Sequence, residues 1–171
     1  YFGDKCSVYG IDIEEACKIY ANDYTSIFIG DQEDRGFWNK FFNEVGSVDI
    51  IIDDGGHSSE QQLVSFEEAL PMINPGGVYL CEDINAKGSD KHSMFAEYSS
   101  HFIHELNHIK RDTKSQNLES SVSNFQSEIK SIHFYPYLFV VEKNKKPISK
   151  FRAPKQGISW QPFFDEKNII E

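Results

Sequence analysis

Pairs of adjacent carboxylates follow two apolar segments of this sequence, and a histidine comes soon after the first pair. The first apolar segment covers residues 48–52 and the second covers residues 77–81. The polar residues that follow these segments are Asp53, Asp54, His57, Glu82 and Asp83. Open α/β sheets bind their ligands at the carboxyl ends of their strands, so we expect the two places to form one site. Carboxylates suit a hard metal ion such as Mg²⁺, and an imidazole beside them suits a general base.

The composition is that of one globular domain. The chain has 171 residues, of which 39% are hydrophobic and 14% aromatic, enough for a single packed core. Its net charge of −10 argues against binding to nucleic acid, because phosphate contacts need a basic surface. No apolar run approaches the ~20 residues of a membrane-spanning helix, and residues 1–5 lack the order of a signal peptide. We therefore expect neither nucleic acid nor a membrane as a partner.

Cysteine usage indicates a reducing compartment. Cys6, Cys17 and Cys81 are odd in number and far apart, so no disulfide framework is expected and a cytoplasmic location fits. Cys81 lies within an apolar segment, and we expect it to be a small residue of the core.

Strand and helix patterns alternate along the first half of the chain. The expected strands cover residues 7–13, 26–31, 48–53 and 77–84. The expected helices cover residues 14–20, 34–45, 59–73 and 93–109. Such alternation predicts βαβ units and a parallel sheet, and the continuous apolar strands predict burial on both faces of that sheet.

The sequence of the second half of the chain predicts antiparallel strands in place of parallel ones. Residues 110–127 are polar and are expected to form a loop. The apolar runs 129–134 and 138–142 flank a Tyr-Pro-Tyr turn, and so short a connection requires antiparallel pairing. We predict an α/β, Rossmann-like domain over residues 1–146, mostly parallel with an antiparallel C-terminal hairpin, followed by a solvated extension over residues 147–171.

Four stretches of the sequence match the pattern of one enzyme family. They are Tyr9-Gly10-Ile11-Asp12-Ile13, Ile29-Gly30-Asp31-Gln32, Asp53-Asp54-Gly55-Gly56-His57 with Glu60-Gln61-Gln62, and Pro75-Gly76-Gly77-Val78-Tyr79 with Glu82-Asp83. In combination they resemble the class I S-adenosylmethionine (SAM)-dependent methyltransferases, and more closely the metal-dependent sugar O-methyltransferases of the macrocin and mycinamicin type. The closing hairpin resembles the antiparallel last strand of that fold. The resemblance covers roughly residues 5–85 and implies a three-layer Rossmann-like sheet.

One part of the family's pattern is missing from this sequence. Such methyltransferases begin with a strand and a G-x-G-like loop that wraps the amino-acid part of SAM, whereas the first strand expected here resembles the family's second. In that fold the first strand lies between the second and the fourth, so its loss would leave two buried strands with unpaired backbone groups. We therefore infer that the chain is a fragment of a longer protein, or that another segment or chain fills the gap.

The resemblance assigns the SAM site to the ends of the expected strands. Asp12 would accept hydrogen bonds from the ribose hydroxyls. Gly30, Asp31 and Gln32 would hold the adenine, with Asp31 accepting from its exocyclic amine. Alternatively, Asp12 is an acid at the start of a helix, Asp31 a turn residue and Gln32 a surface amide. Asp53 would line the SAM pocket or fix its own loop by hydrogen bonds.

The resemblance makes Asp54, Glu82 and Asp83 the ligands of Mg²⁺. Consecutive residues of a strand point to opposite sides, so both acids of a pair meet one ion only where the backbone turns sharply, as Gly55 and Gly56 permit. Without a metal, the clustered carboxylates would raise one another's pKa. A metal-free acidic pocket is the alternative.

His57 is the candidate catalytic base. It follows Asp54 by one short loop, and it could take the proton of an acceptor hydroxyl as that oxygen attacks the methyl group of SAM. The alternative is a histidine that caps or packs against the next helix.

The expected function is Mg²⁺-assisted transfer of the methyl group of SAM to a sugar hydroxyl of a glycan or a glycosylated natural product. There are two alternatives: a metal-dependent hydrolase or oxygenase that uses the same acidic site, and a non-catalytic nucleoside-binding or assembly domain that lost the glycine loop. The sequence does not identify the acceptor, the methylated position or the oligomeric state. A group of aromatic residues fits either the core or the contact of a homo-oligomer. These residues are Phe37, Trp38, Phe41 and Phe42.

Overall fold

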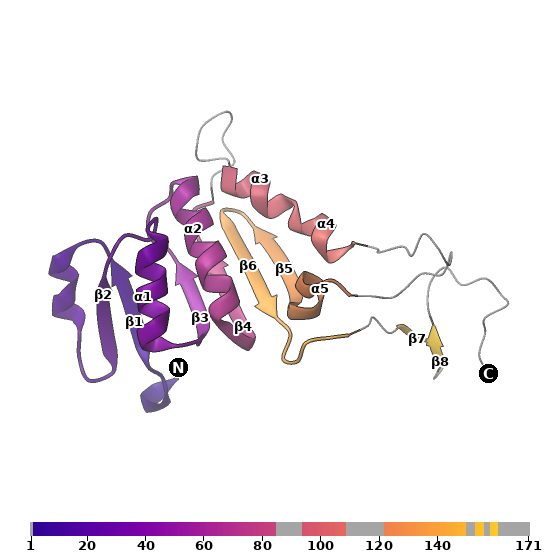
Figure 1. Ribbon diagram of the computed structural model, residues 1–171, viewed down its shortest axis with the longest axis horizontal. Helices are drawn as coiled ribbons and strands as arrows, with labels where there is room; N and C mark the ends of the chain where they lie inside the picture. Colours follow the sequence, from indigo (N-terminus) through magenta and orange to yellow (C-terminus); the bar gives the residue numbers. More distant parts are fainter. Residues whose placement is uncertain (1, 85–93, 109–121, 150–152, 156–157, 161–171) are drawn as a thin grey trace.

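Strands and helices alternate in the order that the sequence predicts for the first half of the chain (Figure 1). The computed structural model describes residues 2–84, 94–108, 122–149, 153–155 and 158–160. The strands are β1 (Val8–Asp12), β2 (Thr25–Ile29), β3 (Val48–Asp53), β4 (Ile73–Cys81), β5 (Ile129–Tyr135), β6 (Leu138–Lys143), β7 (Ala153–Lys155) and β8 (Ile158–Trp160). The α-helices are α1 (Arg35–Val45), α2 (Ser59–Ala69), α3 (Met94–Ser100), α4 (Phe102–Leu106) and α5 (Asn124–Glu128). The 3₁₀ helices are η1 (Gly3–Lys5), η2 (Glu15–Tyr20) and η3 (Leu70–Met72).

Several helices differ in form from the expectation. The expected helix over residues 14–20 is the 3₁₀ helix η2, and the one over residues 93–109 is divided at His101 into α3 and α4. Residues 93 and 109 themselves lie outside the described residues. None of the helices in the described ranges is long and apolar enough to cross a bilayer.

The boundary between α2 and β4 also lies earlier than expected. The helix expected over residues 59–73 ends at Ala69, and Pro71 follows in η3. A proline removes a helical hydrogen bond and clashes with the preceding turn, which accounts for the end of α2. Strand β4 then covers Ile73–Cys81, so it begins and ends earlier than the strand expected over residues 77–84. Of the loop expected over residues 110–127, residues 110–121 lie outside the described part of the chain, and the start of α5 occupies its end.

The sheet is mostly parallel and closes with an antiparallel hairpin, as predicted. β1 pairs with β2, and β3 pairs with β4, in parallel. β6 pairs antiparallel with both β4 and β5, giving the order β3-β4-β6-β5. The hairpin turns at Tyr137, whose φ of 63° is the left-handed conformation typical of tight turns. This is the Rossmann-like arrangement expected from the sequence.

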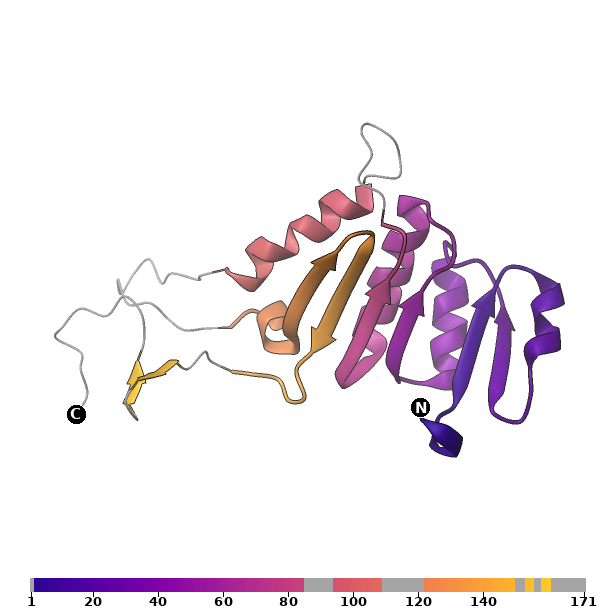
Figure 2. The same cartoon turned by 180° about the vertical axis from the view of Figure 1, so that it is seen from behind.

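Strands β1 and β3 lie side by side but share no hydrogen-bonded pairing. They belong to separate sheets, and both views show them pointing the same way with open edges toward each other (Figures 1 and 2). No strand of the described ranges lies between them. Their separation is what the missing first strand of the resembled family predicts, because that strand would pair with both.

One face of the sheet carries the core. Tyr79 and Cys81 on β4 pair with Val141 and Phe139 on β6, and all four are fully buried. Helices α1 and α2 lie over this face (Figure 1), and Phe66 of α2 packs edge-on against Tyr79.

The opposite face of the sheet has no helical cover among the described residues. Ile50 and Ile52 of β3 pair with Val78 and Leu80 of β4 on that face, and Ile52 is 64% exposed. The sequence predicts a sheet that is buried on both faces between two layers of helices. Among the described residues, helices cover one face of the sheet.

The aromatic residues of α1 belong to the core. Trp38, Phe41 and Phe42 are 5–7% exposed, and Phe41 packs edge-on against Phe28 of β2. The indole Nε1 of Trp38 donates to the carbonyl oxygen of Gln32 at 2.9 Å. Of the two readings of this cluster, the structure supports the core, and the packing of α1 fixes the loop that carries Gln32.

Candidate active site at the carboxyl edge of the sheet

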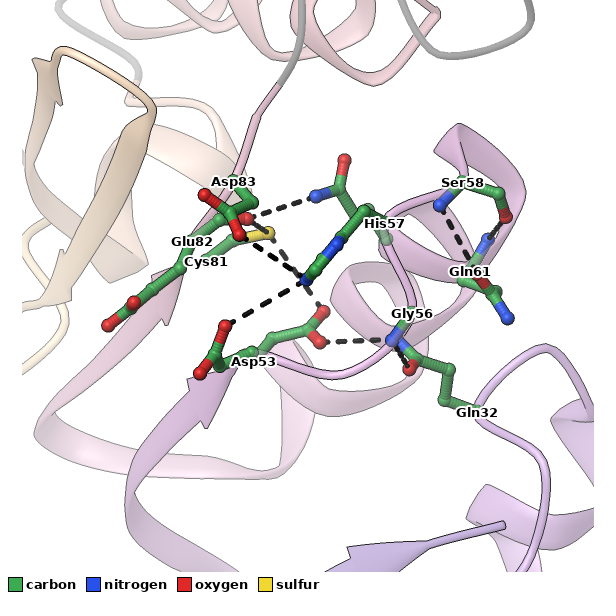
Figure 3. A network of polar contacts seen from close by, with 11 residues as sticks. Gln32, Asp53, Gly56, His57, Ser58, Gln61, Cys81, Glu82 and Asp83 are labelled. Atoms are coloured by element: carbon green, nitrogen blue, oxygen red, sulfur yellow. Dashed lines mark hydrogen bonds and ion pairs between the residues drawn. The ribbon is translucent and has the colours of Figure 1, made fainter.

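The carboxyl ends of β1, β2, β3 and β4 lie along one edge of the molecule (Figures 1 and 2). There, one ligand atom each of Asp54, His57 and Asp83 lies within 4.8 Å of the other two. The Nε2 atom of His57 is 3.5 Å from Oδ2 of Asp83 and 3.9 Å from Oδ1 of Asp54, and Figure 3 shows the ring directed toward Asp83. All three side chains are about half exposed. The structure thus brings together two acids from different strand ends and one imidazole, accessible from solvent.

The two acids after β3 have different surroundings. Asp53 points inward: its Oδ1 accepts from Nε2 of Gln32 at 3.1 Å and its Oδ2 from the hydroxyl of Tyr79 at 2.9 Å. Burial raises the pKa of Asp53, and the hydrogen bonds from Tyr79 and Gln32 oppose that shift. Asp54 faces the site. Of the two roles considered for Asp53, these contacts favour fixing the loop by hydrogen bonds.

Gln32 ties the loop after β2 to the loop after β3. Its Nε2 also donates to Oγ of Ser65 at 3.0 Å. Its Oε1 accepts from the backbone N–H of Gly56 at 2.5 Å, a contact shown in Figure 3. A Cβ on Gly55 would lie 2.2 Å from the same Oε1, so only glycine leaves room for this contact. The structure directs the side-chain amide of Gln32 to Asp53 and this loop, and its role toward adenine stays a prediction.

The two acids after β4 also diverge. Asp83 has a φ of 53°, a left-handed conformation that costs a non-glycine residue about 1–3 kcal/mol. This turn of the backbone brings the Asp83 carboxylate to His57, whereas the Glu82 carboxylate points away from the imidazole (Figure 3). Asp54 and Asp83 therefore share the site with His57, and Glu82 is not part of that group.

Helix α2 begins directly after this loop and is capped by its own residues. Oγ of Ser58 accepts from the N–H of Gln61, and Oε1 of Gln61 accepts from the N–H of Ser58, both at 3.2 Å. This capping box is visible in the sequence as Ser-x-x-Gln. The N-cap of α2 is therefore Ser58, the residue directly after His57.

The residues expected at the SAM site lie at the ends of β1 and β2. Oδ1 of Asp12 accepts from the N–H of Glu14 at 2.8 Å, and this hydrogen bond lowers the pKa of Asp12. Oδ1 of Asp31 accepts in the same way from the N–H of Glu33 at 2.9 Å. A Cβ on Gly30 would lie 2.0 Å from the ring of Phe37, so packing alone requires glycine there. Both acids lie along the same edge of the molecule as Asp54 (Figures 1 and 2), each anchored by a local turn.

Two residues of the matching stretches have contacts beside the site that the sequence did not indicate. Tyr79 anchors Asp53, and Gln62 donates from Nε2 to the carbonyl oxygen of Glu82 at 3.1 Å. Gln62 precedes Phe66 by one helical turn, so it lies on the buried face of α2. A polar residue at a core position is the signal that could have identified it.

The thiol of Cys81 lies below the site and is fully buried, as the sequence predicts. Burial raises the pKa of this thiol well above its ordinary value, and the nearby carboxylates of Asp53 and Glu82 add to the shift. We expect iodoacetamide near pH 8 to leave Cys81 unmodified in the folded protein, because the thiolate is the reactive form. Mass spectrometry of the digested protein measures this, with the partly exposed Cys6 as the internal control. Alkylation of Cys81 as fast as Cys6 before unfolding would contradict the packing described here.

The donor set fits a hard divalent cation. Carboxylate oxygens are the ligands that Mg²⁺ prefers, and Mg²⁺ is bound through one or two carboxylates while keeping positions for water or substrate. Asp54 and Asp83 supply two carboxylates, and their exposure leaves such positions open to solvent.

Comparison with known proteins finds relatives that share both sequence and fold. No family model matches the chain. It is 36% identical over 84 residues to demethylmacrocin O-methyltransferase of Streptomyces fradiae, covering 49% of this chain and 21% of that protein. It is 26% identical over 144 residues to 8-demethyl-8-alpha-L-rhamnosyl tetracenomycin-C 2'-O-methyltransferase of Streptomyces olivaceus, covering 80% of this chain and 37% of that protein.

A solved structure of such a methyltransferase matches the fold of this chain. The MycE methyltransferase of the mycinamycin biosynthetic pathway, in complex with Mg and SAH, matches with a TM-score of 0.67 and 25% sequence identity, over 81% of this chain and 37% of that chain. The present chain thus spans about a fifth to somewhat over a third of the length of these relatives. It has the Rossmann-like fold of the class I methyltransferases, and its homologues are sugar O-methyltransferases.

Proposed function

We propose that this chain, which has the fold of sugar O-methyltransferases and is 26–36% identical to two of them over the aligned residues, is the part of a SAM-dependent O-methyltransferase that carries its metal site and catalytic base. The acceptor would be a sugar hydroxyl of a glycosylated natural product or a glycan. The observation that carries the proposal is the convergence of Asp54, His57 and Asp83 within 4.8 Å at the carboxyl edge of the sheet.

The relatives support this reaction class. The relatives are named as O-methyltransferases of demethylmacrocin, of the 2' position of 8-demethyl-8-alpha-L-rhamnosyl tetracenomycin-C and of the 2'' position of mycinamicin VI. The MycE methyltransferase forms complexes with Mg and SAH, and with Mg, SAH and Mycinamycin VI. Neither of the alternatives, a hydrolase or oxygenase and a non-catalytic domain, has such support.

Asp54 and Asp83 are the residues that would hold Mg²⁺. Their carboxylates come from two strand ends and face the same point. Glu82 is the third expected ligand, and it would join them only by rotating its side chain toward the site. When bound, Mg²⁺ would position the acceptor hydroxyl and lower its pKa.

His57 would accept the proton of that hydroxyl at Nε2, the ring nitrogen that faces Asp54 and Asp83. A bound SAM would supply the methyl group: its carbon would form a C–O bond with that oxygen while the C–S bond breaks and its electron pair stays on sulfur as a neutral thioether. The hydroxyl proton would move to His57. The protein's remaining contribution is the alignment of oxygen, carbon and sulfur.

SAM would lie along the ends of β1 and β2. The Asp12 carboxylate, with its lowered pKa, suits the ribose hydroxyls, and Gly30, Asp31 and Gln32 lie where the adenine is expected. We infer that a further strand, from the same polypeptide or another chain, pairs with the open edges of β1 and β3 and completes this cradle.

Calorimetric titration with SAM tests the cofactor assignment. We expect the polypeptide that includes the strand between β1 and β3 to bind SAM and, with Mg²⁺ present, to release SAH when a glycosylated acceptor is added. The absence of SAM binding, with and without Mg²⁺, would exclude a methyltransferase.

A further inference from the structure

We propose that Gln62 is a positioning residue that holds Asp83 in the conformation the metal site requires. This inference rests on the proposed metal site of Asp54 and Asp83. It concerns a side chain that does not face the reacting groups and acts through the backbone of β4.

Several hydrogen bonds hold the backbone around Asp83. The N–H of Glu82 donates to the carbonyl oxygen of Asp53 at 2.9 Å, and the N–H of Ile84 donates to the carbonyl oxygen of Tyr137 at 3.1 Å. The third hydrogen bond, from Nε2 of Gln62 to the carbonyl oxygen of Glu82, fixes the peptide unit that leads directly into Asp83. A residue with positive φ persists only where its surroundings determine it. Two side chains add to that constraint: the amide of Gln62, and the thiol of Cys81, a weaker donor whose Sγ lies 3.7 Å from the same carbonyl oxygen.

The position of Gln62 in α2 connects the two halves of the site. Helix α2 begins at Ser59, directly after the loop that carries Asp54 and His57. One turn later, Gln62 reaches the end of β4. The same helix therefore positions both acids of the site. Its first turn follows the loop that carries Asp54, and the side-chain amide of Gln62 contacts the backbone next to Asp83.

Stability alone does not explain a glutamine at this position. Gln62 is 1% exposed, and among the described residues its Oε1 has no hydrogen-bond partner. A buried acceptor without a partner destabilises the fold. Methionine has a similar shape and would fill the space without this cost, but it cannot donate to the Glu82 carbonyl. The contact with Glu82 is what glutamine adds.

The substitution Gln62→Met separates the two roles. We expect the free energy of unfolding in urea to stay the same or rise slightly, because the lost hydrogen bond is offset by removal of the unpaired acceptor. We expect the affinity for Mg²⁺, measured by titration calorimetry with MgCl₂, to fall about 10- to 100-fold, as for other residues that orient metal ligands. Gln62→Leu provides a second variant without the donor.

Gln126 provides a matched control. It is also a buried glutamine, 3% exposed, and its Nε2 donates to the carbonyl oxygens of Leu106 and His108 at 2.9 Å, in a part of the fold away from the strand ends. Gln126→Met should lower the free energy of unfolding and leave the Mg²⁺ affinity unchanged.

The outcomes distinguish this inference from the proposed function. If the parent protein binds Mg²⁺ and Gln62→Met binds it equally well, Gln62 does not position Asp83, and the metal site stands. If Gln62→Met and Gln62→Leu lose stability as Gln126→Met does, with unchanged affinity, the role of Gln62 is structural. If the parent protein does not bind Mg²⁺ at all, the proposed metal site fails and this inference fails with it.

Discussion

Replacement of Asp54 by alanine is expected to abolish Mg²⁺-dependent methyl transfer. The variant removes one of the two carboxylates that face the shared point with His57. Loss of residues that merely orient metal ligands already costs about 10- to 100-fold in affinity or activity, so loss of a direct ligand should cost at least about 100-fold. The measurement is the rate of SAH release from SAM with a glycosylated acceptor, at increasing MgCl₂ concentrations.

The same variant should reveal the metal site without any turnover. Asp54 is 59% exposed, so Asp54→Ala should keep the free energy of unfolding within about 0.5 kcal/mol of the parent when no metal is present. Adding Mg²⁺ at 100 times its dissociation constant should stabilise the parent by about 2.7 kcal/mol and leave the variant unchanged. Asp23→Ala, an exposed acid in the turn before β2, is the control. Equal stabilisation of parent and Asp54→Ala by Mg²⁺ would remove Asp54 from the metal shell.

The second large effect is expected at His57. In His57→Ala no described side chain replaces Nε2 beside the two acids, so kcat should fall about 10²- to 10⁴-fold, the usual contribution of a general base. The dissociation constant of SAM, measured by calorimetry, should change little, because the imidazole faces Asp54 and Asp83 and not the ends of β1 and β2.

Added imidazole tests whether the lost group is a base. We expect free imidazole to restore part of the rate of His57→Ala, since the deletion leaves space for it. His104→Ala, which removes an exposed imidazole on α4, should keep the full rate. Full activity of His57→Ala would return this histidine to a structural role.

The alternation of strands and helices was predictable because each element carries its own pattern. The apolar runs that became β1 to β4, and the helical spacing of α1 and α2, are local features of the sequence. The resemblance to sugar O-methyltransferases and the Rossmann-like sheet are confirmed by the comparisons. The open edges of β1 and β3 also followed from the sequence, because the strand that would pair with both was missing from the pattern.

Other features of the fold depend on contacts that the sequence does not display. The coverage of only one sheet face by the described helices could not be read from strands that are apolar throughout. The 3₁₀ form of η2 and the division of α3 from α4 at His101 are further examples. Helical spacing predicts that a segment is helical, but tertiary packing determines the type of helix and the residue at which it ends.

The site was predictable in its composition more than in its geometry. The acids at the two strand ends and His57 were identified from spacing, yet the rule that neighbours on a strand point apart left two candidates at each end. The structure separates them through long-range contacts: Gln32 and Tyr79 turn Asp53 inward. At the other strand end, a left-handed φ directs Asp83 to His57. The hydrogen bonds of Asp53 and the left-handed φ of Asp83 could not be predicted from the residues next to them in the sequence.

The most direct measurement is the anomalous diffraction of crystals grown with MnCl₂ as a substitute for Mg²⁺. We predict one strong anomalous peak in bonding contact with carboxylate oxygens of Asp54 and Asp83, with His57 beside it. The absence of a peak there at saturating Mn²⁺, with the two acids ordered, would contradict the account.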